Sequence, residues 1–395
     1  MKQPLFSKIR KLKENGEDFA YFCRFSSLDR SQGEEFLFRT EERPFLFYDG
    51  ARSALDDAVP QLIRESGNHG SQIPLFTSFS LVQETLGIRS RHERYWPLIG
   101  TILPSETETG TFTRKGEPYI NRNLGQIELH DEERGKLEDS ISEIVERIRE
   151  GEALQIVLSH HFELEEFNGS DVLVHLLRND RSRYVYYYKF GNLEIIGSSP
   201  ENVFQKHGEM LSVSPIAGTR KRQTDTDENL VRSLLSDNKE LCEHRMLVDL
   251  ARNDLSRIGI AGSVAVTSNM MPEKFYSVVH LTSRVDARIS PGNSNFQIFS
   301  SLFPAGTVSG APKARAIEII DQYESQERGP YGGAVGILGE GDMDMALAIR
   351  SAFMNRGRAY TQAGAGIVKD SVPRNEIEEI IAKAETIMAG GLTCA

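Results

Sequence analysis

Residues 184–197 read YVYYYKFGNLEIIG, two runs of β-branched and aromatic residues separated by Gly191-Asn192. A two-residue loop containing glycine, between runs of this composition, is typical of a β-hairpin. Residues 202–214, NVFQKHGEMLSVS, predict a second hairpin with its turn at His207-Gly208. Because tight hairpins join antiparallel strands, this part of the chain predicts a largely antiparallel sheet.

The surrounding sequence places strands and helices in separate runs rather than in a regular βαβ alternation. A helix is predicted over 127–152, because Ile141, Ile144, Val145 and Ile148 share one face. Further helices are expected over 228–259, after Lys313 and over 374–390, and further strands over 45–50, 73–82, 95–103, 153–164, 333–339, 346–355 and 358–368. Separate runs of this kind favour the α+β class.

Composition limits the classes of function. The 395 residues carry a formal net charge of −11, and an acidic chain without a basic block is a poor binder of nucleic acid. Three scattered cysteines, no stretch long enough to span a membrane and a basic amphipathic start unlike a signal peptide predict a soluble cytoplasmic protein. Because the chain is acidic overall, any anion site must use local cations, backbone amides or a metal.

Two pairs of glutamates are candidates for a metal site. Glu240 and Glu243 are three residues apart in the middle of a predicted helix, and Glu376 and Glu379 repeat the spacing on the terminal helix. Residues at this spacing share a helix face. If the two faces meet, four carboxylates form an oxygen cage suited to Mg²⁺. Taken alone, each pair is more typical of a solvated helix face.

Other residues could bind or protonate an anionic substrate. Glu201, in SSPE, could serve as a general acid if burial raised its pKa, or could simply be a turn acid beside Pro200. Arg350, Tyr331, Lys383 and the amides of 363–367 could bind a carboxylate, although each also has an ordinary structural interpretation. His280 is more typical of a satisfied core histidine.

Residues 304–313, PAGTVSGAPK, look like a loop that binds phosphate, but they differ from a P-loop. Lys313 comes three residues after Gly310, and Ala314 stands where the hydroxyl residue belongs. What remains is an amide-rich turn before a helix, which could face a carboxylate or merely join two elements.

Several motifs together resemble the chorismate-utilising enzymes, which include anthranilate synthase component I, aminodeoxychorismate synthase component I, and the isochorismate and salicylate synthases. The motifs are PIAGTR (215–220), EHRMLVDLARNDL (243–255), FPAGTVSGAPKARAIEII (303–320), RGPYGGAVG (328–336), GDMDMALAIR (341–350) and QAGAGIV (362–368). The resemblance spans about residues 125–390. It implies a layered sandwich of largely antiparallel sheets flanked by helices, like that of anthranilate synthase. Residues 126–395 would form the catalytic region and 1–125 a weakly matching part of one packed unit.

The resemblance also implies roles for the candidate residues. Glu243 and Glu379 look like Mg²⁺ ligands supported by Glu240 and Glu376, and Glu201 looks like the acid that protonates the departing C4 hydroxyl of chorismate. His280 resembles the histidine near the pyruvate-elimination chemistry. The residues expected to bind substrate are Gly306, Thr307, Tyr331, Arg350, Gly364, Gly366 and Lys383.

The nucleophile distinguishes members of the family. Water-using members place a lysine in the strand that resembles 153–164, where this chain has Gln155, which cannot take a proton. Aminodeoxychorismate synthases commonly carry lysine where this chain has Ala217, so no side-chain amine is available there. The interpretation is anthranilate synthase component I of tryptophan biosynthesis, a lyase, with aminodeoxychorismate, isochorismate or salicylate synthase as alternatives.

Two expectations concern partners and regulation. No amidotransferase signature occurs, and Cys394 is penultimate, so the resemblance implies a separate glutamine amidotransferase subunit that supplies ammonia. Tryptophan-regulated members carry Leu-Leu-Glu-Ser and Asn-Pro-Ser-Pro-Tyr-Met segments. This chain has neither, and RNDRSRYVYYY (178–188) stands at the second. Regulation by tryptophan is therefore either absent or built from other residues.

Overall fold

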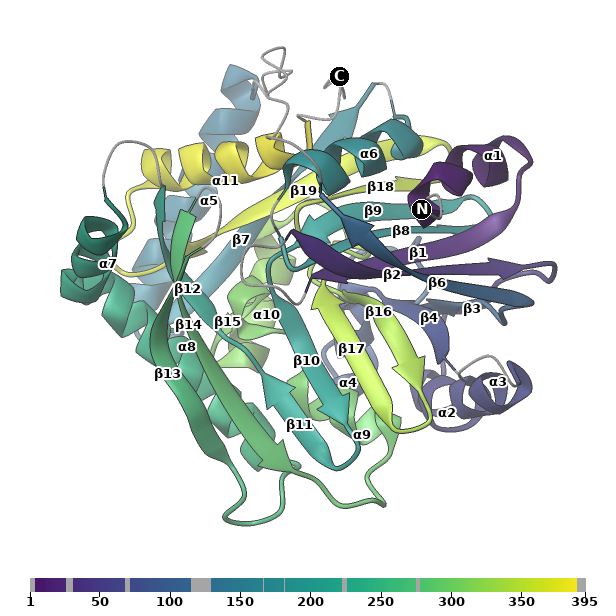
Figure 1. Ribbon diagram of the computed structural model, residues 1–395. Helices are drawn as coiled ribbons and strands as arrows, with labels where there is room; N and C mark the ends of the chain where they lie inside the picture. The colour runs from purple at the N-terminus through teal and green to yellow at the C-terminus, as the bar shows by residue number, and fades with distance from the viewer. Residues whose placement is uncertain are drawn as a thin grey trace.

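The structure is a computed structural model that describes residues 4–25, 31–67, 72–114, 129–165, 167–180, 182–221, 226–274 and 278–388. Within these residues, two large sheets pack face to face and helices cover their outer faces (Figure 1). Every strand pairing in both sheets is antiparallel. This is the predicted α+β class with its largely antiparallel sheets.

The first sheet collects strands from both ends of the chain. Its order is β15 (Gly310–Ala311), β7 (Gln155–Leu164), β19 (Arg358–Ile367), β18 (Ser351–Asn355), β9 (Leu193–Ser199), β8 (Tyr184–Phe190), β1 (Asp18–Phe25), β2 (Gln32–Thr40) and β6 (Glu106–Thr113).

The second sheet is built in the same way. Its order is β12 (Ile216–Lys221), β14 (Val278–Arg288), β11 (Met210–Val213), β10 (Asn202–His207), β17 (Asp342–Leu347), β16 (Ala334–Gly339), β4 (Gln72–Thr77), β5 (Ile99–Thr101) and β3 (Phe45–Phe47), with β13 (Ala265–Lys274) paired to β14. Both sheets thus draw strands from each side of the domain boundary predicted at residue 125, which stays a prediction.

The helices form two outer layers. Three cover the first sheet, namely α5 (Asp131–Arg149), α6 (Gly169–Asn179) and α11 (Pro373–Met388). The second sheet shares a core with two helices, α8 (Asn238–Ser256), which packs on β12 and β14, and α9 (Asn295–Leu302), which packs on α8. The helix α7 (Asp227–Ser236) lies beside α8. The α10 helix (Lys313–Tyr323) follows β15 and packs on β7. Shorter helical segments are α1 (Ile9–Glu14), α2 (Ala51–Ser53), α3 (Val59–Glu65), α4 (Val82–Thr85), η1 (Leu5–Lys8), η2 (Ala54–Ala58), η3 (Phe79–Leu81) and η4 (Gly306–Val308).

Three hydrophobic cores match this arrangement of layers. One lies between the first sheet and its helices, a second between the other sheet and its helices, and a third between the two sheets. The strand β8 contributes to two of them. Tyr184, Tyr186 and Tyr188 lie in the inter-sheet core, and Tyr187 lies on the helix side. All four are buried and their hydroxyls bond Asp344, Ser351, Gly336 and Glu194. This is how a strand buried on both faces can be rich in tyrosine.

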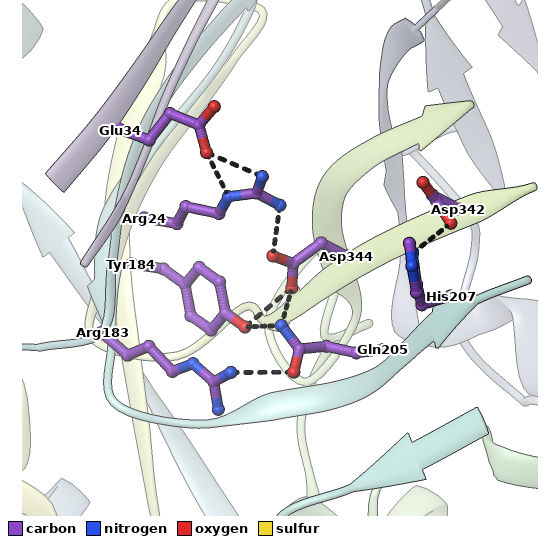
Figure 2. A network of polar contacts seen from close by, with 8 residues as sticks. All are labelled: Arg24, Glu34, Arg183, Tyr184, Gln205, His207, Asp342 and Asp344. Atoms are coloured by element: carbon purple, nitrogen blue, oxygen red, sulfur yellow. Dashed lines mark hydrogen bonds and ion pairs between the residues drawn. The ribbon is translucent and has the colours of Figure 1, made fainter. Parts of the chain in front are cut away.

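A polar network joins the two sheets at one end of β8 (Figure 2). The buried Asp344 of β17 accepts hydrogen bonds from the Tyr184 hydroxyl at 2.7 Å and from Gln205 Nε2 at 3.0 Å. Arg24 of β1 donates to the other Asp344 oxygen at 3.2 Å and also pairs with Glu34. Arg183, from the segment 178–188, donates to Gln205 Oε1 at 2.8 Å. Asp344 therefore connects strands of both sheets.

Most predicted elements are confirmed. The hairpin of 184–197 has Phe190 opposite Leu193, and Gly191 takes the positive φ of +61° that its turn requires. The second hairpin is also present, although its turn residues are Gly208 and Glu209 rather than His207 and Gly208. The helix predicted over 127–152 is α5 and buries the four predicted residues, while its predicted first two residues, 127 and 128, lie outside the described residues.

Several predicted elements are wrong in extent. The strand expected over 73–82 ends at Thr77 and is followed by η3 and α4, and the strand expected over 95–103 covers only Ile99–Thr101. The helix expected over 228–259 is two helices, because the chain is extended at Asp237, whose carboxylate accepts a hydrogen bond from Glu240 N at 3.3 Å. Glu240 therefore lies in the first turn of α8 rather than in mid-helix. The strand expected over 346–355 is divided at residues 348–350 between β17 and β18, which belong to different sheets. Arg350 lies at this crossing with φ +48°.

Candidate active site

Glu201 lies in the loop between β9 and β10, at the point where the chain passes from the first sheet to the second. Its backbone is fixed by the Leu347 N–H, which donates to the Glu201 carbonyl at 3.0 Å. The Thr307 hydroxyl donates to Glu201 Oε1 at 2.9 Å. Burial raises the pKa of Glu201 to about 7, although the Thr307 hydrogen bond and the charges of Arg350 and Lys383 act to lower it. A carboxyl with this pKa can donate a proton near neutral pH.

Arg350 lies between β17 and β18, at a second point where the chain passes from one sheet to the other. Its carbonyl accepts a hydrogen bond from Ser198 N at 3.1 Å, so the two crossings are tied together. The left-handed backbone at a residue other than glycine is strained and is retained where the surroundings require it. The Arg350 charge acts on Glu201, His280 and Asp180. Arg350 thus brings a cation to the candidate acid, as expected for an anion site.

Asp180 is a residue that the sequence prediction missed. It accepts hydrogen bonds from Ser198 Oγ at 2.7 Å and from Ser182 N at 2.5 Å. Burial opposes its ionisation, but the Arg350 charge and these hydrogen bonds hold the pKa of Asp180 below its usual value. The carboxylate therefore offsets part of the Arg350 charge. The only signal in the sequence was its place in the segment 178–188, which departs from the family pattern.

His280 lies on β14 opposite a bulge in β12. Gly218 takes φ +66° at the bulge, and this turns its carbonyl toward His280 Nδ1 at 3.1 Å. Burial lowers the pKa of His280 to about 4 against the effect of this hydrogen bond, and Arg350 lowers it further. His280 is thus a neutral base at pH 7 with Nδ1–H as the donor. Glu240 is close by, because a Cβ added at Gly218 would lie 3.3 Å from Glu240 Oε2.

The strand β19 and the helix α11 carry three predicted substrate-binding residues, Gly364, Gly366 and Lys383, and β7 carries Gln155. Lys383 Nζ donates to the Gly364 carbonyl at 2.9 Å. A Cβ at Gly364 would lie 2.9 Å from the buried Tyr331 hydroxyl, and one at Gly366 would lie 2.3 Å from Gln155 Nε2. Both glycines therefore permit side chains to approach the strand closely. Gln155 is 7% exposed, and its side chain lies against Gly366 of β19.

Residues 304–313 form the turn η4 and the short strand β15, which pairs with β7. Val157 N donates to the Ser309 carbonyl at 2.9 Å, and Leu154 N to the Ala311 carbonyl at 2.7 Å. Gly306 packs against Leu250 of α8, where a Cβ would overlap the leucine. Lys313 Nζ pairs with the Asp254 carboxylate at 2.8 Å in a buried ion pair, so it serves packing of α8 rather than phosphate binding.

The four predicted metal ligands lie on α8 and α11 with the spacing expected from the sequence. Their carboxylates are the hard oxygen donors that Mg²⁺ prefers, so the donor chemistry fits that ion. Glu240 pairs with Arg220 at 3.0 Å, and Glu379 pairs with Lys383 at 2.7 Å. Across the described residues, no three His, Cys, Asp or Glu side chains gather closely enough to hold a metal. The magnesium site stays a prediction.

Hydrogen bonds and charge interactions connect the predicted catalytic and substrate-binding residues into one site. Glu201 and Arg350 lie at two crossings between the sheets, Thr307 of η4 bonds Glu201, and the Arg350 charge acts on His280 of β14. The Lys383 charge also acts on Glu201, and Lys383 of α11 bonds Gly364 of β19, which lies close to the Tyr331 hydroxyl. A surface groove of about 720 Å³, lined by residues 15–18, 39–43, 105 and 106, holds none of the predicted site residues. The site therefore combines a proton donor near neutral pH, a neutral base and cations able to bind carboxylates.

No helix among the described residues is long and apolar enough to cross a membrane. The sequence pattern of the chorismate binding enzymes matches residues 107–389. Anthranilate synthase component 1 of *Neisseria meningitidis* serogroup C is 44% identical over 252 residues, which are 63% of this chain and 51% of that protein. The protein of the same name from *Aquifex aeolicus* is 41% identical over 307 residues, 76% of this chain and 62% of that one. The chain thus spans about half the length of the first of these relatives.

Solved structures show the same fold. The crystal structure of anthranilate synthase component I from *Streptococcus pneumoniae* superposes with a TM-score of 0.73 at 30% identity, covering 94% of this chain and 92% of that one. A putative 2,3-dihydroxybenzoate-specific isochorismate synthase from *Bacillus anthracis* also has a TM-score of 0.73, at 21% identity, over 98% of this chain and 99% of that one. The second likeness concerns the fold alone.

Proposed function

The chain belongs to the chorismate binding enzyme family, and from this premise we propose that it is the component of an anthranilate synthase that aminates chorismate. The observation that carries the proposal is the environment of Glu201. Its pKa of about 7, next to Thr307 and within reach of the Arg350 charge, suits an acid that protonates a leaving hydroxyl beside bound carboxylates. The choice of chorismate as the substrate rests on the family motifs, and the choice of reaction rests on the names of the sequence relatives.

The proposed reaction has two stages. Ammonia forms a bond to C2 of chorismate while the C4–oxygen bond breaks, and the departing hydroxyl takes the proton of Glu201 and leaves as water. The new ammonium group loses one proton to become the amine, which balances the proton that Glu201 donated. The C2 proton is then removed as the C3–oxygen bond breaks, which gives the aromatic ring of anthranilate, and the departing enolpyruvate takes up a proton at its methylene carbon to become pyruvate. His280 is neutral above pH 4 and is suited to accept a proton at this stage. Arg350, Tyr331 and the strand of Gly364 would orient the enolpyruvyl carboxylate.

The choice of ammonia rests on the absence of an amine at two positions. Gln155 is a buried amide that cannot deprotonate water, and Ala217 offers no nucleophile. Ammonia needs no base because its nitrogen lone pair is a much stronger nucleophile than the oxygen of neutral water. A lysine introduced at Gln155 should therefore produce some isochorismate in the absence of ammonium, and a variant that produces none would weaken this explanation of nucleophile choice.

We propose that Mg²⁺ is the cofactor, held by Glu243 and Glu379 with Glu240 and Glu376 in support. When bound, the ion supplies positive charge that offsets the ring carboxylate of the substrate. In the present arrangement Arg220 and Lys383 neutralise two of these glutamates. Lys383 can then bind the same ring carboxylate once Glu379 is engaged elsewhere, and it remains anchored to Gly364.

We also propose a partner. A glutamine amidotransferase subunit would supply ammonia, since the name component 1 of the sequence relatives implies a second component. The isolated chain should then use ammonium but not glutamine. Turnover of glutamine by the isolated chain would contradict this part of the proposal.

The test is incubation of the chain with chorismate, Mg²⁺ and ammonium, followed by identification of the products. Fluorescent anthranilate with an equal amount of pyruvate supports the proposal. A 4-amino product without pyruvate would identify an aminodeoxychorismate synthase instead, and conversion without any ammonia source would identify a water-using enzyme. Glu201→Gln is the control that removes the proton donor.

A further inference from the structure

Arg328 and Glu324 form a buried ion pair next to the candidate active site, and the proposed chemistry does not use this pair. Arg328 of the loop before β16 pairs with Glu324 at the end of α10, and their side chains are 2% and 5% exposed. Arg328 Nε and Nη2 donate to the two carboxylate oxygens at 2.8 and 2.6 Å, which is a bidentate arrangement. A pair of this kind is weak evidence for stability, because well-packed apolar residues often serve as well. The role of this pair must therefore be sought in its other contacts.

The remaining donors of Arg328 reach two elements of the site. Nη1 donates to the Val308 carbonyl at 2.5 Å, and Nη2 donates to the Val157 carbonyl at 2.8 Å. Val308 follows Thr307 in the turn η4, and Val157 lies two residues beyond Gln155 on β7. The guanidinium also lies 4.5 Å from the ring centre of Phe79 and 5.7 Å from that of Tyr331. One side chain thus contacts the neighbours of Thr307 and Gln155, and Tyr331 itself.

Glu324 extends the same contacts to the first sheet. Its Oε1 accepts hydrogen bonds from Ser159 N at 2.9 Å and from Ser159 Oγ at 2.6 Å. Gln362 Nε2 of β19 donates to Ser159 Oγ at 2.8 Å. The ion pair therefore holds η4 at a fixed position relative to β7 and β19, the strands that carry Gln155, Gly364 and Gly366.

We propose that the Arg328–Glu324 pair is a positioning unit for the candidate acid: it fixes the turn η4 so that Thr307 donates its hydroxyl hydrogen to Glu201. The turn contains three residues, and its own carbonyl–amide bonds are long, at 3.2 and 3.3 Å. The strong Arg328 bond to the Val308 carbonyl therefore determines where the Thr307 side chain lies. The role as stated rests on the proposed function of Glu201.

The experiment is a cycle between Thr307 and the ion pair. Glu324→Gln with Arg328→Met removes both charges together, leaves the net charge unchanged and removes the donors to both carbonyls. The pKa of Glu201 is read by infrared difference spectroscopy, with Glu201→Gln assigning the carboxyl band, and kcat and KM are read against pH. Arg350 and Lys383, the cations that act on Glu201, are unchanged in every variant.

The expected result is non-additive. Thr307→Val alone should raise the pKa of Glu201 by about one unit, the effect of one lost hydrogen bond to a carboxylate. The double variant should raise it similarly and lower kcat about tenfold or more with a smaller change in KM. Adding Thr307→Val to the double variant should then shift the pKa no further. An equal shift in both backgrounds, or an unchanged Glu201 pKa in the double variant, would overturn the proposal.

Arg328→Lys covers the case in which the double variant does not fold, as judged by circular dichroism. Lysine keeps a cation beside Glu324, but one ammonium cannot reproduce the bidentate bond together with both carbonyl contacts. The same cycle with Thr307→Val applies to it. The infrared titration needs no substrate, so it tests the positioning role even if the wild-type chain makes no product from chorismate. A wild-type chain that makes no product from chorismate would reject the proposed function, but it would leave the result of the infrared titration valid.

Discussion

At the scale of single residues, Glu201 combines burial with one hydroxyl donor and two nearby cations, and the balance leaves its pKa at about 7. The acid must carry its proton to act, and it is protonated below this pKa. We therefore expect kcat to fall as pH rises through about 7. His280, with a pKa of about 4, is neutral on both sides of this transition and adds no step to it.

The measurement must separate the acid from the nucleophile, since ammonium loses a proton as pH rises. Rates are compared at constant free ammonia, and the decrease near pH 7 should remain. Glu201→Gln should lower kcat by about 10²–10⁴-fold with little change in chorismate binding and should abolish the step. A variant that keeps the decrease would show that another group controls it.

The glutamates on α8 and α11 give a second prediction at this scale. Glu379→Gln should weaken Mg²⁺ binding by roughly tenfold or more, measured by isothermal titration calorimetry with Mg²⁺ alone. Glu378→Gln is the matched control, because Glu378 is the next residue on the same helix and pairs with Arg134 instead. Equal affinities in the two variants would remove Glu379 as a ligand.

At the scale of elements, the short strand β15 attaches the C-terminal end of the turn η4 to β7, in addition to the Arg328 contact. Gly310 has φ +136°, and a Cβ there would lie 2.2 Å from the Gln155 carbonyl oxygen. Gly310→Ala should therefore detach β15 from β7 and lower the free energy of unfolding by about 2–4 kcal/mol. Activity should fall with it, because Thr307 moves with the turn.

Urea unfolding provides the measurement for Gly310→Ala. Gly341→Ala is the control, since a Cβ at Gly341 would meet nothing within 4 Å, and its effect should stay within about 0.5 kcal/mol. If both variants unfold at the same urea concentration, the close approach of β15 to β7 is not what constrains Gly310.

Local signals account for the elements that the sequence predicts well. The hairpin at Gly191-Asn192 and the strand at 358–367 depend on turn chemistry and composition, which are visible in the sequence. The break at Asp237 had a local signal as well, since Ser236, Asp237 and Asn238 are typical of a helix boundary. The crossing at Arg350 had none, because residues 346–355 look like one continuous strand and only tertiary packing divides them between sheets.

The candidate site shows the same limit. Spacing alone placed Glu240 with Glu243, and Glu376 with Glu379, on common helix faces. The partners of those faces, Arg220 and Lys383, depend on how α8 and α11 pack. Asp180, Glu324 and Arg328 were missed because their importance lies in contacts between segments distant in the sequence, which no local pattern contains.

At the scale of the whole molecule, Asp344 connects the two sheets through Arg24, Tyr184 and Gln205 (Figure 2). Asp344→Asn keeps the shape but loses the charge and forces one donor–donor contact, so we expect about 1–3 kcal/mol of destabilisation in urea unfolding. The control is Asp342→Asn on the same strand, whose partner His207 is 92% exposed. That variant should change stability by less than about 1 kcal/mol. Equal effects would argue against Asp344 as the connection.

The four tyrosines of β8, Tyr184, Tyr186, Tyr187 and Tyr188, give the protein an internal optical reporter. Burial raises the pKa of each of these phenols, so alkali cannot ionise them while the strand stays between its neighbours. Their ultraviolet absorbance should change in one cooperative step, together with the loss of β-sheet dichroism. A base titration of this chain would thus follow the opening of the sandwich rather than the chemistry of individual phenols.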